Sequence, residues 1–436
     1  MRIAVIGAGI VGVTTAYELA ADGHQPVVFE RRNSVAAENS FANAGIVAPG
    51  YVAPWAAPGM PRRLLAQMLA RHAAWRLRPG ADPGAWRWLW RWWRACQPAR
   101  YQEQRSAMHR LAAYSQQRLH EIRRLHRLDY ERSEGYLVLL RGERDVALAM
   151  PGLELLRQME VPAQLLDPQH CREREPHLHP DTPLSAGIAV PGDEVGNCRQ
   201  FAHLLREEAQ RLGARFEFGT EALAIDPDTR PILLLEARGA GSGGPGLGGP
   251  AEAVAPKRRR EQFDAVVVCA AVPSLKLLEP LGMGLPLMPV HGYSLSAALR
   301  NHERGPLSAV MDERYKVVIS RQGSRVRVAG GAELGGAPER HSQAVLATLY
   351  KVLHDWFPGA AQLQQVQVWK GARPMLPDGP PVIGASGAPG VWLNLGHGAS
   401  GWALACGSAR LLADQLNRRS PAIDAGAFLA ARFARR

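Results

Sequence analysis

Cysteine is scarce in this chain, and its placement excludes several kinds of site. Only five cysteines occur among 436 residues. They are far apart, their number is odd and no Cys-x-x-Cys pair occurs, so no disulfide framework, zinc site or iron–sulfur site is predicted and no metal is expected. Cys269 falls in an apolar strand and Cys406 in an apolar helix, which predicts that both are buried. With no signal-peptide pattern, this usage indicates a reducing, cytoplasmic location.

Long apolar runs and acidic residues are also in short supply. No stretch reaches about eighteen uninterrupted apolar residues, so no transmembrane span is predicted. Lys and Arg together number 52 against 40 Asp and Glu, which gives a net charge of +12. This excess favours an anionic cofactor, an anionic substrate or an acidic membrane surface. No recognisable RNA- or DNA-binding module is present, so no nucleic-acid partner is expected.

Glycine, by contrast, is concentrated at the start of the chain in the pattern of a dinucleotide-binding loop. The run Gly7-Ala8-Gly9-Ile10-Val11-Gly12 follows an apolar strand over 2–6 and opens an apolar-periodic helix. A second strand over 26–29 then ends on Glu30, eighteen residues after Gly12. This spacing predicts a complete βαβ unit, with a pyrophosphate at the helix N-terminus and ribose hydroxyls on Glu30.

This first unit alone does not decide between FAD and NAD. Arg31 and Arg32 follow Glu30 directly, and an arginine there can read the 2′-phosphate of NADP. Glu30 would repel that phosphate, so we interpret the two arginines as solvated charges or as neighbours of the flavin phosphates. Both FAD and NAD stay open at this point.

A second strand, glycine loop and helix near the C-terminus favours FAD. The strand over 391–395 leads into Gly396, His397, Gly398 and Gly401, and an apolar helix follows. Two glycine-rich helix starts fit a ligand with two ends, a pyrophosphate at one and an isoalloxazine ring at the other, whereas NAD would not require the second. A buried strand over 265–271 closes on small residues at Ala270, as expected where backbone passes a dinucleotide.

Three further segments carry expectations of their own. The loop over 42–59 is rich in small residues and is expected to lie against a ligand. A helix with Trp86, Trp88, Trp90, Trp92 and Trp93 among arginines fits either an anionic membrane surface or a helix buried on one side. Residues 238–260 are of low complexity and end in the basic run 257–260, and we expect a flexible insertion.

Together these motifs resemble the bacterial FAD-dependent D-amino acid dehydrogenases, relatives of D-amino acid oxidase and glycine oxidase. The similarity runs nearly from end to end. It rests on the first glycine loop, on the loop with Pro49-Gly50-Tyr51 and the run over 54–59, on Pro191-Gly192-Asp193-Glu194, and on further short motifs. Those further motifs lie at 292–294, 311–317, 373–379 and 396–402. Leu376 and Leu395 stand where threonine is usual, which affects the expected choice of substrate more than the reaction.

The resemblance implies oxidative deamination of D-amino acids to 2-oxo acids and ammonia, with D-alanine the expected substrate. It implies hydride transfer from the substrate α-carbon to a non-covalently held FAD, and transfer of the electrons to a quinone or another respiratory-chain acceptor. It also implies that Arg373 anchors the substrate carboxylate, since a guanidinium holds a carboxylate through two bonds. Tyr293 and Tyr315 are candidates for closing the site, and His397 for orienting the substrate. The enzyme is expected in the cytoplasm, with peripheral contact at the inner face of the bacterial inner membrane.

The expected fold is α/β, with a Rossmann-like FAD-binding domain built from discontinuous segments and a substrate domain with a mainly antiparallel sheet and helices. The FAD-binding domain is expected over 1–61, 186–275 and 365–436, and the substrate domain over 62–185 and 276–364. The residues expected to bind the cofactor are Ile3, Val5, Ile6, Gly7, Ala8, Gly9, Ile10, Val11, Gly12, Val13, Val28, Phe29, Glu30, Arg31, Arg32, Ala44, Gly45, Ala270, Gly396, His397, Gly398 and Gly401.

Other functions stay open on the sequence. One is a flavin amine oxidase acting on glycine, sarcosine or D-proline derivatives, which hydrogen peroxide production would reveal. Another is an NAD(P) dehydrogenase, which would be colourless. A third is a basic nucleic-acid- or membrane-binding protein that keeps a degenerate nucleotide fold.

Overall fold

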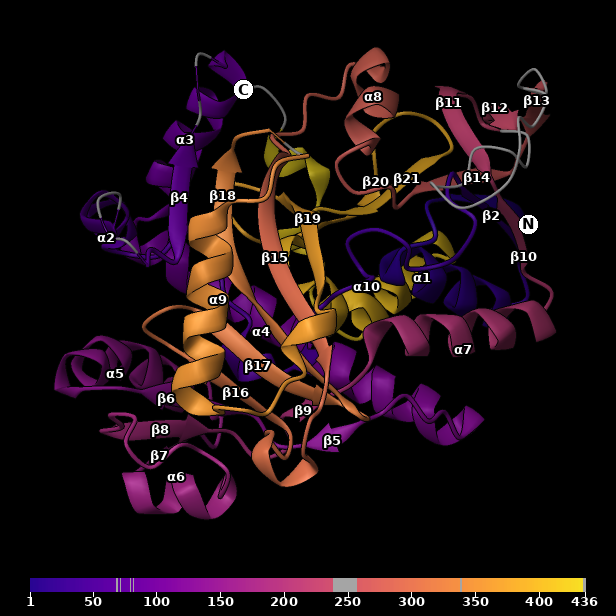
Figure 1. The fold of residues 1–436 in the computed structure, drawn as a ribbon. Helices are drawn as coiled ribbons and strands as arrows, with labels where there is room; N and C mark the ends of the chain where they lie inside the picture. The colour runs from indigo at the N-terminus through magenta and orange to yellow at the C-terminus, as the bar shows by residue number, and fades with distance from the viewer. Residues whose placement is uncertain are drawn as a thin grey trace.

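A computed structural model of the chain describes residues 1–67, 70, 72–78, 80, 82–237, 257–337 and 339–433. Two sheets organise these residues (Figure 1). A six-stranded sheet lies with α1, α7 and α10 on one side of the view, and a long, mainly antiparallel sheet with α9 lies beside it.

The six-stranded sheet has the order β10-β2-β1-β14-β21-β20. All neighbours in it pair in parallel except β20 with β21. Its central strands are apolar throughout and buried on both faces, as a parallel sheet between helices requires. The strands are β1 (Arg2–Ile6), β2 (Gln25–Glu30), β10 (Arg215–Phe218), β14 (Ala265–Val268), β20 (Val382–Ala385) and β21 (Val391–Leu395).

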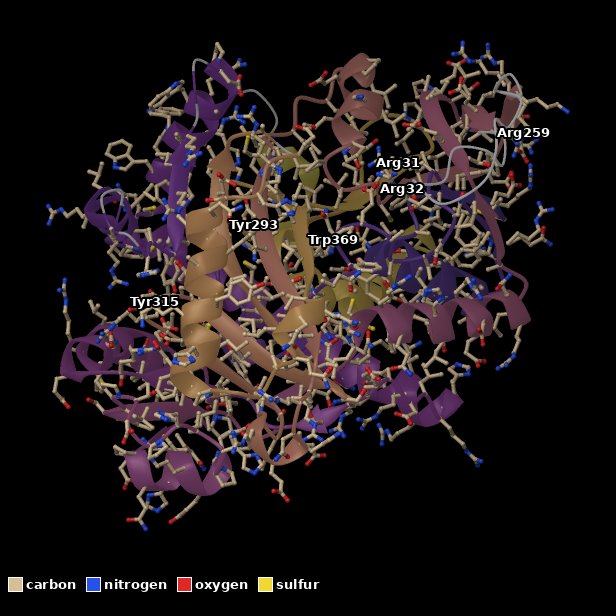
Figure 2. All side chains as sticks on the ribbon, viewed as in Figure 1. Arg31, Arg32, Arg259, Tyr293, Tyr315 and Trp369 are labelled. Atoms are coloured by element: carbon tan, nitrogen blue, oxygen red, sulfur yellow. The ribbon has the colours of Figure 1, made fainter. Side chains whose placement is uncertain are left out.

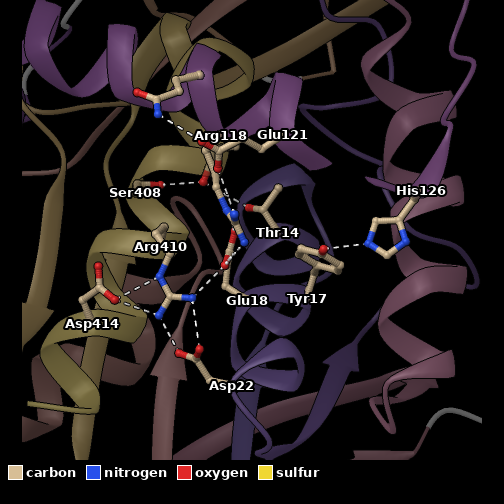
Figure 3. A network of polar contacts seen from close by, with 12 residues as sticks. Thr14, Tyr17, Glu18, Asp22, Arg118, Glu121, His126, Ser408, Arg410 and Asp414 are labelled. Atoms are coloured by element: carbon tan, nitrogen blue, oxygen red, sulfur yellow. Dashed lines mark hydrogen bonds and ion pairs between the residues drawn. The ribbon is translucent and has the colours of Figure 1, made fainter. Parts of the chain in front are cut away.

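Three helices cover one face of this sheet and share one hydrophobic core with it: α1 (Ile10–Ala21), α7 (Cys198–Arg211) and α10 (Gly401–Leu416). A polar network on the far side of α1 fastens it to α10 and to α4 (Pro98–His126) (Figure 3). Its centre is the fully buried Glu18, which accepts hydrogen bonds from Arg118 of α4 and from Arg410 of α10 at 2.7 and 2.9 Å. Each guanidinium also pairs with a second acid, so the buried carboxylate is fully compensated.

The second sheet has the order β19-β15-β18-β17-β16-β6-β8-β7, and β4 pairs with β18 off this path. Its strands are β4 (Trp75–Arg78), β6 (Leu137–Leu140), β7 (Gln164–Leu166), β8 (Ala186–Ala189), β15 (Met288–Ala298), β16 (Ala309–Asp312), β17 (Val317–Gln322), β18 (Arg325–Gly335) and β19 (Gln367–Met375). One face packs on α9 (Gln343–Trp356). Side chains alternate along a strand, so every second residue packs against α9. The residues between them point to the opposite face, toward the cavity described below.

Shorter elements complete the fold. Two small sheets have the orders β3-β9-β5 and β11-β12-β13. Their strands are β3 (Ile46–Val47), β5 (Ser133–Glu134), β9 (Glu194–Val195), β11 (Thr220–Asp226), β12 (Ile232–Ala237) and β13 (Lys257–Gln262). The remaining helices are α2 (Met60–Gln67), α3 (Pro83–Ala95), α5 (Glu143–Gln158), α6 (Pro168–Arg174) and α8 (Ser274–Leu278).

The structure corrects one expectation about the 238–260 segment. Residues 238–256 lie outside the described residues, but the basic run 257–260 forms the start of β13 and pairs with β12. Arg258 pairs with Glu236 and Arg260 with Asp226, at 2.8 and 3.0 Å. The prediction of a flexible loop at 257–260 is therefore wrong, because each arginine of this strand pairs with an acid that is distant in the sequence.

Sheet membership also differs from the predicted segment ranges. β8 and β19 lie in ranges predicted for the FAD-binding domain, yet both pair in the antiparallel sheet. In the described residues, no helix has the length and apolarity that a membrane crossing needs. The predicted burial of Cys269 and Cys406 is confirmed, and Cys96, Cys171 and Cys198 are buried as well.

Candidate active site

A large cavity of about 1060 Å³ runs between the two sheets. The first glycine loop lines it at one end, and the second glycine loop with Arg373 lines it farther along. The loop over 42–59 contributes most of its residues to the wall between them. This volume is at the upper end of that found for single small-molecule sites, so the cavity has room for an extended ligand and a second molecule.

The first glycine loop has the geometry that a pyrophosphate cradle needs. Gly7 adopts φ +100°, a conformation that disfavours any side chain. A Cβ on Gly12 would lie 1.8 Å from the Gly7 carbonyl oxygen, so only glycine lets α1 approach β1 this closely. The N-terminus of α1 therefore opens toward the cavity with its free N–H groups and positive dipole end.

Glu30 stands at the end of β2 and lines the cavity. Its two oxygens accept from the Ala8 and Arg32 backbone N–H groups, both at 2.8 Å. Burial raises the pKa of the Glu30 carboxyl. Each oxygen keeps a second lone pair for a ribose hydroxyl, so Glu30 fits the role expected from its spacing.

Arg31 and Arg32 differ in their placement, although both pair with Glu38. Arg31 lines the cavity, whereas Arg32 does not. Figure 2 shows both on the same side of the molecule as the parallel sheet, away from Tyr293 and Trp369. Because Arg31 and Arg32 share Glu38 as their acid partner, we interpret them as solvated charges beside a phosphate of the cofactor. This pairing fits that interpretation better than a binding site for the 2′-phosphate of NADP.

The predicted cofactor residues divide into lining and supporting positions. Those that line the cavity are Ile6, Gly7, Gly9, Ile10, Val11, Phe29, Glu30, Arg31, Ala44, Ala270, Gly396, His397, Gly398 and Gly401. Those that do not are Ile3, Val5, Ala8, Gly12, Val13, Val28, Arg32 and Gly45. The second group includes buried strand and helix residues that shape the cradle from behind, as Gly12 does.

The second glycine loop joins β21 to α10. Gly396 and Gly398 have φ of +82° and +58°, so the chain turns sharply before α10 begins at Gly401. His397 between them is buried, and its Nε2 lies 3.0 Å from the Ser408 hydroxyl. Burial lowers the pKa of His397 to about 3, so the imidazole is neutral at working pH.

Arg373 lies on β19 and folds its guanidinium over Gly292 of the neighbouring strand β15. A Cβ on Gly292 would lie 2.3 Å from the guanidinium, so glycine is required there. The guanidinium donates to the Gly331 carbonyl at 2.7 Å, and burial lowers the pKa of Arg373 to about 10, so it remains a cation. Among the described residues, no carboxylate lies within ion-pair distance of it, and its free N–H groups line the cavity. A partly buried cation without an acid partner calls for an anionic ligand.

Tyr293 lines the cavity, but its hydroxyl is already engaged. It donates to Glu333 at 2.5 Å and accepts from the Ser342 N–H at 3.1 Å, and Glu333 also pairs with the buried Lys370. Burial raises the pKa of Tyr293. The Tyr293 ring packs in the hydrophobic core under α9, and its hydroxyl fastens the segment that leads into α9.

Tyr315, which was expected to close the site, does not line the cavity. It packs with the α9 core, and the Arg141 and Lys351 cations lie over its ring. Figure 2 shows it well apart from Tyr293 and Trp369. The next residue, Lys316, lines the cavity instead, since neighbours in this turn point to opposite sides.

Several lining residues carry no motif that the sequence could have revealed. They include Trp369, Arg63, Ser40, Lys276 and the segment 220–223. Ser40 accepts from the Ile10 N–H at 3.1 Å and so occupies one free donor of α1. These positions come from a loop, two helices and two different sheets, which only the tertiary structure brings together.

The fold and the two glycine loops that line one cavity define a dinucleotide-binding oxidoreductase of mixed α/β architecture. The chain belongs to the FAD dependent oxidoreductase family, whose model matches residues 2–415. FAD is therefore its cofactor. The glycine-loop geometry and the cavity volume fit that group.

Relatives and solved structures agree with this membership. The chain is 41% identical over 428 residues to a D-amino acid dehydrogenase of Cereibacter sphaeroides, covering 97% of this chain and 93% of that protein. It is 38% identical over 436 residues to a D-amino acid dehydrogenase of Agrobacterium fabrum, covering 100% of both. Its fold is similar to glycine oxidase from Geobacillus kaustophilus, with a TM-score of 0.72 at 20% identity over 100% of both chains.

Proposed function

We propose that this enzyme oxidises D-amino acids, D-alanine among them, to 2-oxo acids and ammonia. The observation that carries this proposal is Arg373, a cation in the cavity wall with unpaired donors and no acid partner within reach among the described residues. The D-amino acid dehydrogenases to which the chain is similar support the substrate class.

Arg373 would hold the substrate carboxylate through two parallel hydrogen bonds and so fix the α-carbon in one orientation. The β19 strand and the Gly331 carbonyl fix the guanidinium in turn. FAD, when bound, supplies the two-electron chemistry by accepting a hydride. His397, being neutral, would orient rather than exchange a proton, and the N-terminus of α10 would stabilise negative charge beside Gly398 and Gly401.

Tyr293 would act indirectly, by fastening the segment that leads into α9, whereas Tyr315 is not proposed for any role in the site. We also propose that FAD is held non-covalently, because no cysteine lines the second glycine loop. The division into a FAD-binding part over 1–61, 186–275 and 365–436 and a substrate part over 62–185 and 276–364 remains a proposal, with β8 and β19 assigned to the substrate side.

We further propose that the electrons pass to a quinone and that α3 rests on the membrane that carries it. Trp88 and Trp92 face the core, whereas Trp86, Trp90 and Trp93 are 55%, 54% and 55% exposed. The helix contains three arginines, Arg87, Arg91 and Arg94, and no acid. An apolar aromatic face among cations fits an anionic lipid surface.

Cosedimentation with phosphatidylglycerol-containing vesicles tests the membrane contact. Replacing the three exposed tryptophans by serine is expected to abolish binding. Replacing three exposed leucines elsewhere, Leu125, Leu212 and Leu307, by serine is expected to leave it intact. Equal loss in both triple variants would refute a role specific to α3.

The visible absorption spectrum of the purified protein tests the reaction. Under anaerobic conditions, flavin bands that bleach with D-alanine and persist with L-alanine are the expected result. Bands that persist with D-alanine but bleach with glycine or D-proline, with hydrogen peroxide formed in air, would favour an amine oxidase instead. A colourless protein that FAD cannot reconstitute would refute both.

A further inference from the structure

One wall of the cavity is a single row of side chains across the antiparallel sheet. Strand register places Trp369, Ser294, Ala329, Val318, Met311, Val138 and Ile188 opposite one another in turn. All seven line the cavity. With strands about 4.8 Å apart, this row extends the cavity roughly 29 Å across the sheet.

Arg373 lies near one end of this row, because its guanidinium covers Gly292 on β15. Four strand spacings, or about 19 Å, separate β15 from β6. A phenylalanine side chain spans less than two strand spacings, or about 10 Å. No amino acid held by its carboxylate on Arg373 reaches the far end of the row.

That far end is an apolar space with its own roof, which we call the distal chamber. Its floor is Val138 and Ile188, and its roof is Leu148, Leu153 and Leu156 of α5. The floor residues belong to a hydrophobic cluster separate from the core under α9. Neither glycine loop contributes to it, so the chamber is also distinct from the dinucleotide cradle.

Tyr136 gives the distal chamber an unused hydrogen-bond donor. Tyr136 is 5% exposed and lines the cavity, and its buried hydroxyl has no partner among the described residues. Burial raises the pKa of Tyr136 well above its usual range, so the hydroxyl keeps its proton and can donate. An unpaired buried donor is rare, and it points to a ligand that supplies an acceptor.

The distal chamber reaches the surface beside a polar group of three residues. Tyr51 donates to Glu313 at 2.7 Å and accepts from Lys316 at 3.2 Å, and all three line the cavity. The Lys316 side chain is 44% exposed and Leu148 is 47% exposed, so the chamber opens between the turn at 313–316 and α5. A molecule can therefore enter here without passing the end of the cavity that holds Arg373.

We propose that the distal chamber binds the electron acceptor, a quinone, with a ring carbonyl accepting a hydrogen bond from Tyr136. A quinone ring is flat and apolar and carries acceptors without donors, which matches the aliphatic walls and the unpaired donors of Tyr136 and Arg105. This inference rests on the proposed function, because only a dehydrogenase that hands electrons to a second molecule needs a second site in the cavity.

Titration calorimetry of the oxidised holoenzyme with decylubiquinone tests the assignment. Saturable binding of one molecule per chain is expected. Leu153→Trp fills the chamber and is expected to lower the affinity at least tenfold. Tyr136→Phe keeps the ring and removes the donor, and a loss of about three- to tenfold is expected. Met150→Trp, on the exposed face of the same helix, is the matched control and is expected to stay within twofold.

Three outcomes would overturn the assignment. They are no saturable binding to the wild-type enzyme, decylubiquinone affinity within twofold of wild type in both Tyr136→Phe and Leu153→Trp, or loss of D-phenylalanine affinity in Leu153→Trp with decylubiquinone affinity intact. The last result would make the chamber a pocket for substrate side chains. Failure of the proposed function is separate, since D-alanine would then not bleach the flavin although decylubiquinone still binds.

Discussion

Replacing Arg373 by methionine is expected to remove most substrate recognition while leaving the cofactor bound. A hydrogen bond to a charged group contributes about 1.5–3 kcal/mol, and two such bonds are available from the unpaired side of the guanidinium. Their loss corresponds to about 3–6 kcal/mol, or a decrease of about 10²- to 10⁴-fold in kcat/KM. Arg373→Lys retains the charge but not the two-pronged geometry, so we expect a decrease between that of methionine and wild type.

Anaerobic stopped-flow measurement of flavin reduction by D-alanine gives this number directly. The flavin-to-protein absorbance ratio shows whether each variant still holds FAD. Arg325→Met, an exposed arginine on β18 in the same sheet, is the matched control and is expected to stay within twofold. A kcat/KM for Arg373→Met within tenfold of wild type, with FAD bound, would refute the anchor.

Three further changes test the cradle, the network behind it and a buried acid. Gly12→Ala places a methyl group 1.8 Å from the Gly7 carbonyl oxygen, so we expect purification without bound FAD, whereas Gly23→Ala, at an open turn, should keep its colour. Glu18→Gln leaves two guanidinium groups short of their buried partner, so we expect a loss of about 3–5 kcal/mol in urea unfolding. Burial, with Glu194 beside it, raises the pKa of Asp193 from 3.8 to about 8. The folded state then binds a proton more tightly than the unfolded one, so stability should fall as pH rises from about 4 to 8, and Asp193→Asn should flatten that dependence.

The sequence determined the parallel sheet and the first glycine loop. Such local patterns are readable because a βαβ unit closes within thirty residues, and its glycines are required by contacts between near neighbours such as Gly7 and Gly12. Glu30 and the second glycine loop before α10 follow from the same local logic. Arg373 was expected to be the anchor only through the family resemblance, and its anchoring role remains a proposal.

Only the tertiary structure decided which neighbours of a motif face the cavity. Tyr315 and Lys316 are adjacent in sequence, yet one packs under α9 and the other lines the cavity. The basic run 257–260 looks like part of a loop until the fold brings acids from β10, β11 and β12 to its arginines. The row from Trp369 to Ile188 joins six strand pairings, and Tyr136 lies beside it, two residues before Val138. Periodicity along one segment fixes that segment's own faces, whereas such a row depends on the register between segments that are far apart in sequence, as Val138 and Met311 are.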